Sequence, residues 1–151
     1  MEAAGIYARE SATLDRYVQI GVVGSKVISV SFPETPDQDA EAEHALLDRI
    51  FGYLDGEPDE FQDVDVAFTI PTDQRAVLDE VRTIPYGKSA SVEAVARTTA
   101  VLADVEEGET VVRNALRANP APLVVPAHRV TDGPNSAPPA VTKRLRDLEG
   151  L

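Results

Sequence analysis

Runs of β-branched and aromatic side chains in the first part of the chain predict β-strands. Such runs cover residues 17–23 and 26–32, and side chains of this kind pack well on a pleated, half-buried surface. Gly24 and Ser25, which separate the two runs, fit a two-residue hairpin turn. Residues 4–9 predict an additional edge strand, and residues 64–70 predict a connecting extended segment.

Helical spacing of apolar residues replaces this pattern after an acidic, proline-containing loop over residues 33–39. Leu46, Ile50 and Leu54 recur on one stripe, which predicts a helix over residues 40–54.

Four short segments in the second half also predict helices. They cover residues 73–83, 91–101, 108–118 and 138–149. Thr72 and Ser91 are predicted N-caps, because their side-chain oxygens can accept hydrogen bonds from the unpaired N–H groups at a helix start. Asn119 and Pro120 end the third of these helices, since proline disfavours helical geometry in the residue before it. The second and third helices form a candidate helix-turn-helix.

The order of these elements divides the chain between Pro71 and Thr72. Residues 1–71 are expected to form an N-terminal α/β domain, a small sheet plus a helix, and residues 72–151 an all-helical domain. A chain of 151 residues is long enough for two small domains that share an interface.

Charge is distributed unevenly between these halves. The formal net charge is −12; residues 1–71 hold 15 acidic and 4 basic residues, whereas residues 72–151 hold 11 acidic and 10 basic residues. A polyanion such as DNA is therefore expected to meet the second half. Many carboxylates and few lysines suit a cytoplasm of high salt, which predicts a halophilic protein; an ordinary acidic mesophilic protein is the alternative.

The absence of cysteine removes whole classes of chemistry. The chain has no disulfide, no thiolate metal site and no cysteine nucleophile. His44 and His128 are its only histidines, so a histidine-rich zinc or iron site is not expected. No cofactor is expected either. No stretch approaches the roughly 18 apolar residues of a membrane span, and the first residues lack the pattern of a secretory signal. A cytoplasmic protein is expected.

Three motifs in the second half occur in a defined order. Residues 84–88 read Ile-Pro-Tyr-Gly-Lys, residues 117–120 read Arg-Ala-Asn-Pro, and residues 124–130 read Val-Val-Pro-Ala-His-Arg-Val. Together they resemble the signature of O6-alkylguanine-DNA alkyltransferases, which is an IPYG-like turn, a helix-turn-helix ending in R-x-N-P, and then P-C-H-R-V. Residues 53–56 and 148–150 also resemble elements of that family, so the resemblance covers nearly the whole chain.

The resemblance implies a winged-helix-like second domain whose recognition helix enters the DNA minor groove, while a damaged base is flipped into a pocket beside an acceptor cysteine. It also implies roles for residues of this chain. Glu149 and His128 would form the relay that lowers the pKa of the thiol. Asn119 would be the hinge that orders the site, and Arg117 would face DNA. Ala127 would stand at the acceptor position.

The sequence departs from the family pattern at four places. Ala127 replaces the acceptor cysteine, and a methyl group has no lone pair to attack an alkyl carbon. The tyrosine that rotates the nucleotide in the family would fall at Val92, and the arginine that fills the base stack would fall near Thr110. A short proline-rich segment over residues 131–139 replaces the glycine-rich loop that covers the pocket. Alkyltransferase-like proteins also lack the cysteine but keep the tyrosine and the arginine, so the resemblance to that subgroup is partial.

The predicted DNA contacts lie in the candidate helix-turn-helix. They are Ser91, Thr110, Arg113, Asn114 and Arg117. Arg113 and Arg117 share a helix face, where they meet either phosphates or the acidic side chains of residues 104–109. Ser91 either binds a phosphate or only caps its helix. Without a thiol to activate, His128 and Glu149 are expected to form a structural polar pair.

Two functions of different classes fit these observations. The first is a non-catalytic, monomeric homologue of the alkyltransferases that binds double-stranded DNA, with or without alkylated guanine, in damage recognition or repair. The second is a degenerate family member that acts as a protein-interaction module without DNA binding. A third, residual enzyme activity of another kind, also stays open.

Overall fold

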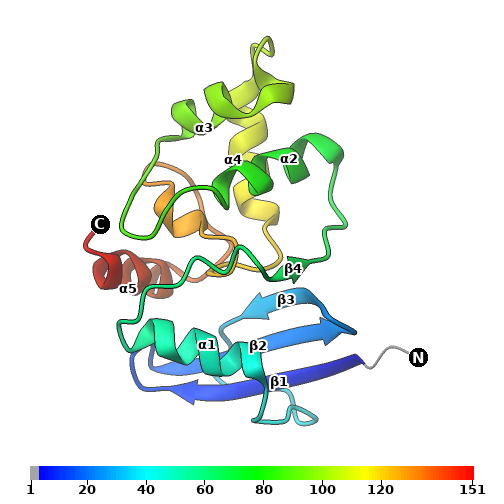
Figure 1. Cartoon of the computed structure of the whole chain (residues 1–151), viewed down its shortest axis with the longest axis vertical. Helices are drawn as coiled ribbons and strands as arrows, with labels where there is room; N and C mark the ends of the chain where they lie inside the picture. The colour runs from blue at the N-terminus through cyan, green and yellow to red at the C-terminus, as the bar shows by residue number, and fades with distance from the viewer. Residues whose placement is uncertain (1–3) are drawn as a thin grey trace.

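The computed structural model describes residues 4–151 and shows a sheet with one helix against it, below a group of helices (Figure 1). β1 (Ala4–Ser11), β2 (Arg16–Val23) and β3 (Lys26–Ser31) form an antiparallel meander, to which β4 (Asp65–Val66) adds in parallel beside β3. The first three residues of the predicted N-terminal domain lie outside the described residues. The predicted α/β first half followed by helices is confirmed.

The strand predictions are confirmed with small shifts at their ends. The two apolar runs correspond to β2 and β3, and Gly24, with a φ of 60°, supplies a left-handed residue in the turn between them. The predicted edge strand extends to Ser11. Of the extended segment over residues 64–70, only Asp65 and Val66 form a strand.

The first helix begins later than predicted. α1 (Ala45–Leu54) has His44 as its N-cap, whose Nδ1 accepts a hydrogen bond from a helix N–H at 3.0 Å. The preceding residues do not enter the helix because Glu41 pairs with β1. Its N–H donates to the Ile6 carbonyl at 3.0 Å, and its carbonyl accepts from the Ala8 N–H at 2.8 Å. The prediction of a helix start at residue 40 is therefore wrong, since the sheet edge competes for these backbone groups.

The second half consists of helices, as predicted. They are α2 (Thr72–Val81), α3 (Val92–Thr98), the short 3-10 helix η1 (Ala100–Leu102), α4 (Gly108–Ala118), the 3-10 helix η2 (Ala127–Arg129) and α5 (Pro139–Glu149). α4 has the predicted bounds. α3 ends before its predicted end at residue 101, because Thr99 leaves the helical region (φ −82°, ψ 111°) while its hydroxyl donates to the Val95 carbonyl at 2.7 Å.

The two predicted N-caps have different outcomes. Ser91 caps α3, since its hydroxyl oxygen accepts from the Ala94 N–H at 3.0 Å. Thr72 is the first residue of α2 and does not cap it; the N-cap is Pro71, which has no side-chain hydrogen bond to offer. Over residues 72–151 the strand-like pairings are isolated bridges, such as the one between Ala90 and Val130, and no β-hairpin forms a wing.

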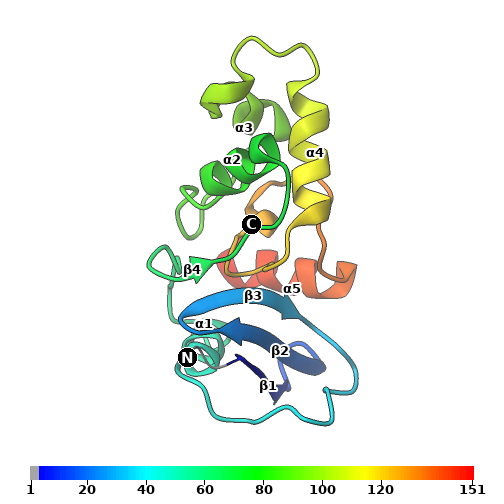
Figure 2. The same ribbon diagram turned by 90° about the vertical axis from the view of Figure 1, so that its right-hand side faces the viewer.

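One apolar core runs through both halves of the molecule. It includes Ile20 and Leu47 from the first half and Val77 and Leu116 from the second. α5 lies between the sheet and the upper helices in both views (Figures 1 and 2). Among the helices that the structure describes, none has the length and apolar character needed to cross a membrane.

Candidate functional site

A buried polar cluster lies where the end of α5 meets η2. Its centre is the carboxylate of Glu149, the last residue of α5. His128 Nε2 lies 2.6 Å from Glu149 Oε2, and the Tyr53 hydroxyl donates to the same oxygen at 2.5 Å. All three residues are buried. Because Tyr53 comes from α1 and the other two residues come from the second half, the cluster ties the two halves together.

Arg129 and the turn over residues 84–88 complete the donors around this carboxylate. Arg129 Nε donates to Glu149 Oε1 at 2.8 Å, and the Gly87 N–H donates to the same oxygen at 2.9 Å. Arg129 Nη1 also donates to the Ile84 carbonyl at 2.8 Å. Gly87 has a φ of 75°, which glycine adopts without strain, so the turn can aim its N–H at the carboxylate.

Burial and hydrogen bonding set the protonation states of this cluster. Burial would raise the pKa of Glu149, but the hydrogen bonds that it accepts, led by those from His128 and Arg129, lower its pKa to about 2. Burial lowers the pKa of His128 against the opposing pull of Glu149, and burial raises the pKa of Tyr53. At neutral pH the carboxylate is therefore ionised and the imidazole is neutral, with its proton on Nε2.

Ala127 precedes His128 on η2 and is fully buried. Since His128 Nε2 donates to Glu149, Nδ1 is an acceptor, and it is buried with no hydrogen-bond partner among residues 4–151. A neutral imidazole with an available acceptor nitrogen suits general-base chemistry. The chain has no cysteine, however, and Ala127 offers only a methyl group.

The loop over residues 131–138 packs tightly on buried side chains beside η2. A Cβ added at Gly133 would lie 2.5 Å from Leu116 Cδ1 and 3.2 Å from side-chain carbons of Val92 and Val130. Only glycine, which has no Cβ, lets the loop backbone approach these three side chains so closely. The loop therefore fills the space above these three side chains.

Hydrogen bonds hold the same loop at both of its ends. Asp132 Oδ1 accepts from the Val92 N–H at 2.7 Å, and the Ser136 hydroxyl donates to the Asn119 carbonyl at 2.8 Å. Asn119 is itself buried, and its side chain bonds the backbone of Ala121 and Val125 at 3.0 and 3.2 Å. Asn119 thus orders the chain that leads from α4 towards η2.

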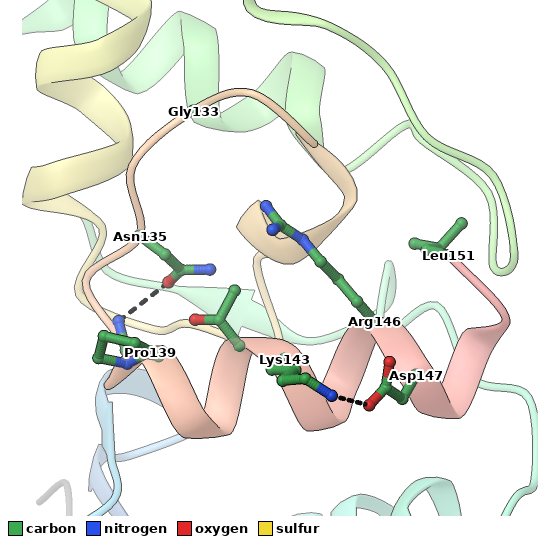
Figure 3. Close-up of a pocket in the computed structure, with 9 residues that line it drawn as sticks. Gly133, Asn135, Pro139, Lys143, Arg146, Asp147 and Leu151 are labelled. Carbon is green, nitrogen blue, oxygen red and sulfur yellow. Dashed lines mark hydrogen bonds and ion pairs between the residues drawn. The ribbon is translucent and has the colours of Figure 1, made fainter.

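A hollow of about 330 Å³ lies between this loop and α5 (Figure 3). Several of the polar groups along it are paired with one another. Asn135 Oδ1 accepts from the Ala137 N–H at 2.9 Å, and Lys143 Nζ lies 2.9 Å from Asp147 Oδ2. Neither Ala127 nor the side chains of the buried cluster line this hollow.

Four of the five predicted DNA contacts share the exposed face of α4. Thr110, Arg113, Asn114 and Arg117 are spaced i, i+3, i+4 and i+7, whereas the apolar residues of the opposite face are buried. Arg117 Nη1 donates to Asn114 Oδ1 at 3.2 Å, and Arg113 lies 3.8 Å from the Glu109 carboxylate. The face therefore carries two guanidinium groups and two uncharged polar side chains.

The surroundings of this face are less favourable to a polyanion. Glu106, Glu107 and Glu109 are exposed just before α4 and in its first turn. Their negative charges offset the positive end of the helix dipole, which would otherwise attract an anion. Ser91, the fifth predicted contact, uses its hydroxyl oxygen to cap α3. Positive charge is thus concentrated in the second half of α4.

Comparison with known proteins bears on both halves. Residues 72–145 match the model of the DNA-binding domain of 6-O-methylguanine DNA methyltransferase. Over residues 72–145 the chain therefore belongs to the O6-alkylguanine-DNA alkyltransferase family. The predicted family is confirmed. No curated protein sequence matches the chain significantly.

Solved alkyltransferase structures share the fold of the whole chain. The O6-methylguanine methyltransferase of Mycobacterium tuberculosis is 22% identical, with 98% of this chain and 92% of that chain covered and a TM-score of 0.73. The M. tuberculosis OGT in complex with DNA is 22% identical, with 97% of this chain and 93% of that chain covered and a TM-score of 0.74. The O6-methylguanine-DNA methyltransferase of Pyrococcus kodakaraensis is 20% identical, with 99% of this chain and 100% of that chain covered and a TM-score of 0.69.

Sequence reasoning assigned no role to Tyr53, Arg129 and Gly87, although each lies in a segment that resembles the alkyltransferase family. Tyr53 and Gly87 are distant from Glu149 along the chain, so only the folded structure brings them to its carboxylate. The signal for Arg129 was present, because it is a charged residue in an otherwise apolar stretch. Among residues 4–151, no group of three or more His, Asp or Glu side chains could hold a metal ion.

Proposed function

We propose that this alkyltransferase-family chain is a non-catalytic protein that binds double-stranded DNA through α4. The observation that carries the proposal is the exposed face of Thr110, Arg113, Asn114 and Arg117, which lies within the segment that matches a DNA-binding domain. Guanidinium and amide groups bind phosphates and base edges. The presence of DNA on the M. tuberculosis OGT, a protein of the same fold, supports this choice of ligand.

Loss of alkyl transfer follows from placing Ala127 at the acceptor position. Transfer requires a nucleophile that bonds to the alkyl carbon as guanine O6 leaves. The His128 imidazole can take a proton, but no thiol stands beside it to give one. The protein would therefore recognise DNA in repair without repairing it.

The loop over residues 131–138 supports binding without nucleotide flipping. An enzyme that flips a base needs a pocket to receive it. Here Val92, at the position of the nucleotide-rotating tyrosine, is buried beneath Gly133. We therefore expect duplexes with and without O6-methylguanine to bind equally.

Fluorescence anisotropy with labelled duplexes across a salt series tests this function. With Arg113 and Arg117 on phosphates, the slope of log K against log salt should be about −2. Arg117→Ala should weaken binding and reduce the slope by about 1. Arg144→Ala, which removes an exposed arginine of α5, is the matched control and should leave binding unchanged.

Phosphate contacts are strongest at low salt. If neither duplex binds at about 50 mM salt, the DNA proposal is wrong. That result would favour the second candidate, a protein-interaction module, which the three glutamates at the start of α4 support. In that case we expect the protein to purify with one stoichiometric protein partner and no nucleic acid.

We further propose that the chain divides into domains over residues 1–71 and 72–151, since both α2 and the family match begin at Thr72. The acidic composition supports a monomer in the cytoplasm of a salt-adapted cell. The oligomeric state is tested by light scattering during size-exclusion chromatography.

A further inference from the structure

The sheet carries a hollow of about 530 Å³ that the DNA proposal does not use. Gly21 alternates along β2 with the core residues Ile20 and Val22 and therefore faces away from the core. Gly21 lines the hollow together with Ile6, its partner on β1, and Ser29, its partner on β3. The hollow thus opens on the face of the sheet opposite the core.

An exposed isoleucine forms part of this hollow. Ile28 is 44% exposed and is one of only three large apolar side chains in residues 4–151 that are this accessible. Its Cγ1 lies 3.2 Å from the place where a Cβ of Gly21 would be. Ile28 and Ile6 therefore offer apolar surface to a ligand, and a volume of this size accepts a few side chains.

Two carboxylates border the same hollow. Asp39 and Glu41 line it, and both residues are exposed. Glu41 is held in place by its backbone pairing with β1. Among residues 4–151, no lysine or arginine lies within ion-pair distance of either carboxylate. An apolar floor with an unneutralised acidic border is complementary to a ligand that is both apolar and cationic.

We infer that this hollow is the docking site for an extended segment of a partner protein in which arginine or lysine alternates with apolar residues. The apolar side chains would contact Ile6 and Ile28, and the cations would pair with Asp39 and Glu41. The strongly acidic first half would attract such a segment and repel nucleic acid. The hollow lies on the sheet, and Figure 1 shows the sheet at the lower end of the molecule and α4 in its upper half, so we expect that both ligands can bind at once.

Titration with blocked peptides tests the inference. The probe is a peptide of alternating arginine and leucine, and its charge-reversed partner has glutamate in place of arginine. We expect binding of the arginine peptide only, with amide shifts in the NMR spectrum at Gly21, Ile28 and Ser29. Ile28→Ser and the double variant Asp39→Asn/Glu41→Gln should each weaken binding about fivefold or more.

The matched control is Glu106→Gln/Glu107→Gln, which makes the same charge change in the turn before α4 and should alter peptide binding less than about twofold. An equal loss in this control, equal affinity for both peptides, or no binding at about 1 mM peptide would overturn the inference. Thermal unfolding of each variant verifies that it is folded. The DNA titration of the Ile28→Ser and Asp39→Asn/Glu41→Gln variants should be unchanged, so failure here is separate from failure of the DNA proposal.

Discussion

At the residue scale, Glu149 is the centre of the buried polar cluster. It is the one buried acidic residue among residues 4–151, and it is compensated by Arg129 and by hydrogen bonds from Tyr53, His128 and Gly87. A buried carboxylate without such partners would cost several kcal/mol. The hydrogen bonds of Glu149 join α1, the turn over residues 84–88 and α5, and we propose that the cluster is structural in a chain that has no thiol to activate.

Glu149→Gln should therefore destabilise the protein strongly. The substitution leaves the guanidinium of Arg129 buried without a counter-charge, which typically costs about 3–5 kcal/mol. Urea denaturation measures the loss. Asp147→Asn removes a carboxylate from the exposed pair with Lys143 on the same helix and should cost less than about 1 kcal/mol. Similar losses in both variants would contradict the structural role.

The same groups predict that acid destabilises the fold. The pKa of Glu149 lies below its ordinary value of 4.5, so its stabilisation is complete above pH 4.5 and is lost as pH falls towards 2. The lowered pKa of His128 acts in the same direction, because the buried imidazole binds a proton less readily than in the unfolded chain; stability should already fall below pH 6.5.

Free energies of unfolding measured from pH 7.5 down to pH 3 should decrease throughout. Glu149→Gln should flatten the curve below pH 4.5, where the carboxylate of the unfolded wild-type chain takes up a proton while that of the folded protein stays ionised. A stability that rises on acidification would mean that the cluster is not ionised as described.

At the scale of elements, local pattern sufficed where no other segment competed for the backbone. α4 has the bounds that its apolar spacing predicted, because one face packs on the core and the other meets solvent. The start of α1 was misplaced because Glu41 bonds to β1 instead, and α3 was shortened because the Thr99 hydroxyl bonds to its own helix. Both errors arise from hydrogen bonds that apolar spacing does not encode.

The loop over residues 131–138 is an element whose role only packing reveals. Gly133→Ala should destabilise the protein by about 1–3 kcal/mol, because the new Cβ would lie 2.5 Å from Leu116 Cδ1. Thermal unfolding measures the effect. Gly108→Ala is the control, since its Cβ would meet nothing closer than 3.6 Å, and alanine in a helix should be neutral or stabilising by up to about 1 kcal/mol.

Shortening Leu116 tests the contact directly. In a double-mutant cycle, Leu116→Ala should remove most of the penalty of Gly133→Ala, because the clash lies between these two side chains. Strict additivity of the two changes in unfolding free energy would show that Gly133 does not pack against Leu116.

At the scale of the whole molecule, charge separates two surfaces. The first half holds 15 acidic and 4 basic residues, while the second is nearly balanced with 11 and 10. In the two proposals the hollow on the sheet takes a cationic partner and α4 takes an anionic one; Figure 1 shows the sheet at the lower end of the molecule and α4 in its upper half. A single chain could in this way join DNA to a basic protein segment.

A net charge of −12 should also make stability depend on salt. Raising KCl from about 0.1 M to 1 M shortens the screening length from about 10 to 3 Å, which weakens repulsion between carboxylates and should raise the Tm. Calorimetry measures the change. The variant Glu34→Gln/Glu43→Gln, which neutralises two exposed carboxylates, should show a smaller rise. A Tm that is constant or falls with KCl would contradict the prediction of a halophilic protein.

The sequence by itself determined the family, the order of strands and helices, which polar residues share the exposed face of α4, and the absence of a thiol. These follow from local periodicity, from motifs in fixed order and from composition. Only the tertiary structure decided that Tyr53, Arg129 and Gly87 converge on Glu149, that Gly133 lies on Leu116, and that Gly21 leaves a hollow in the sheet. Each of these depends on contacts between residues far apart in the chain, which spacing along the sequence cannot specify.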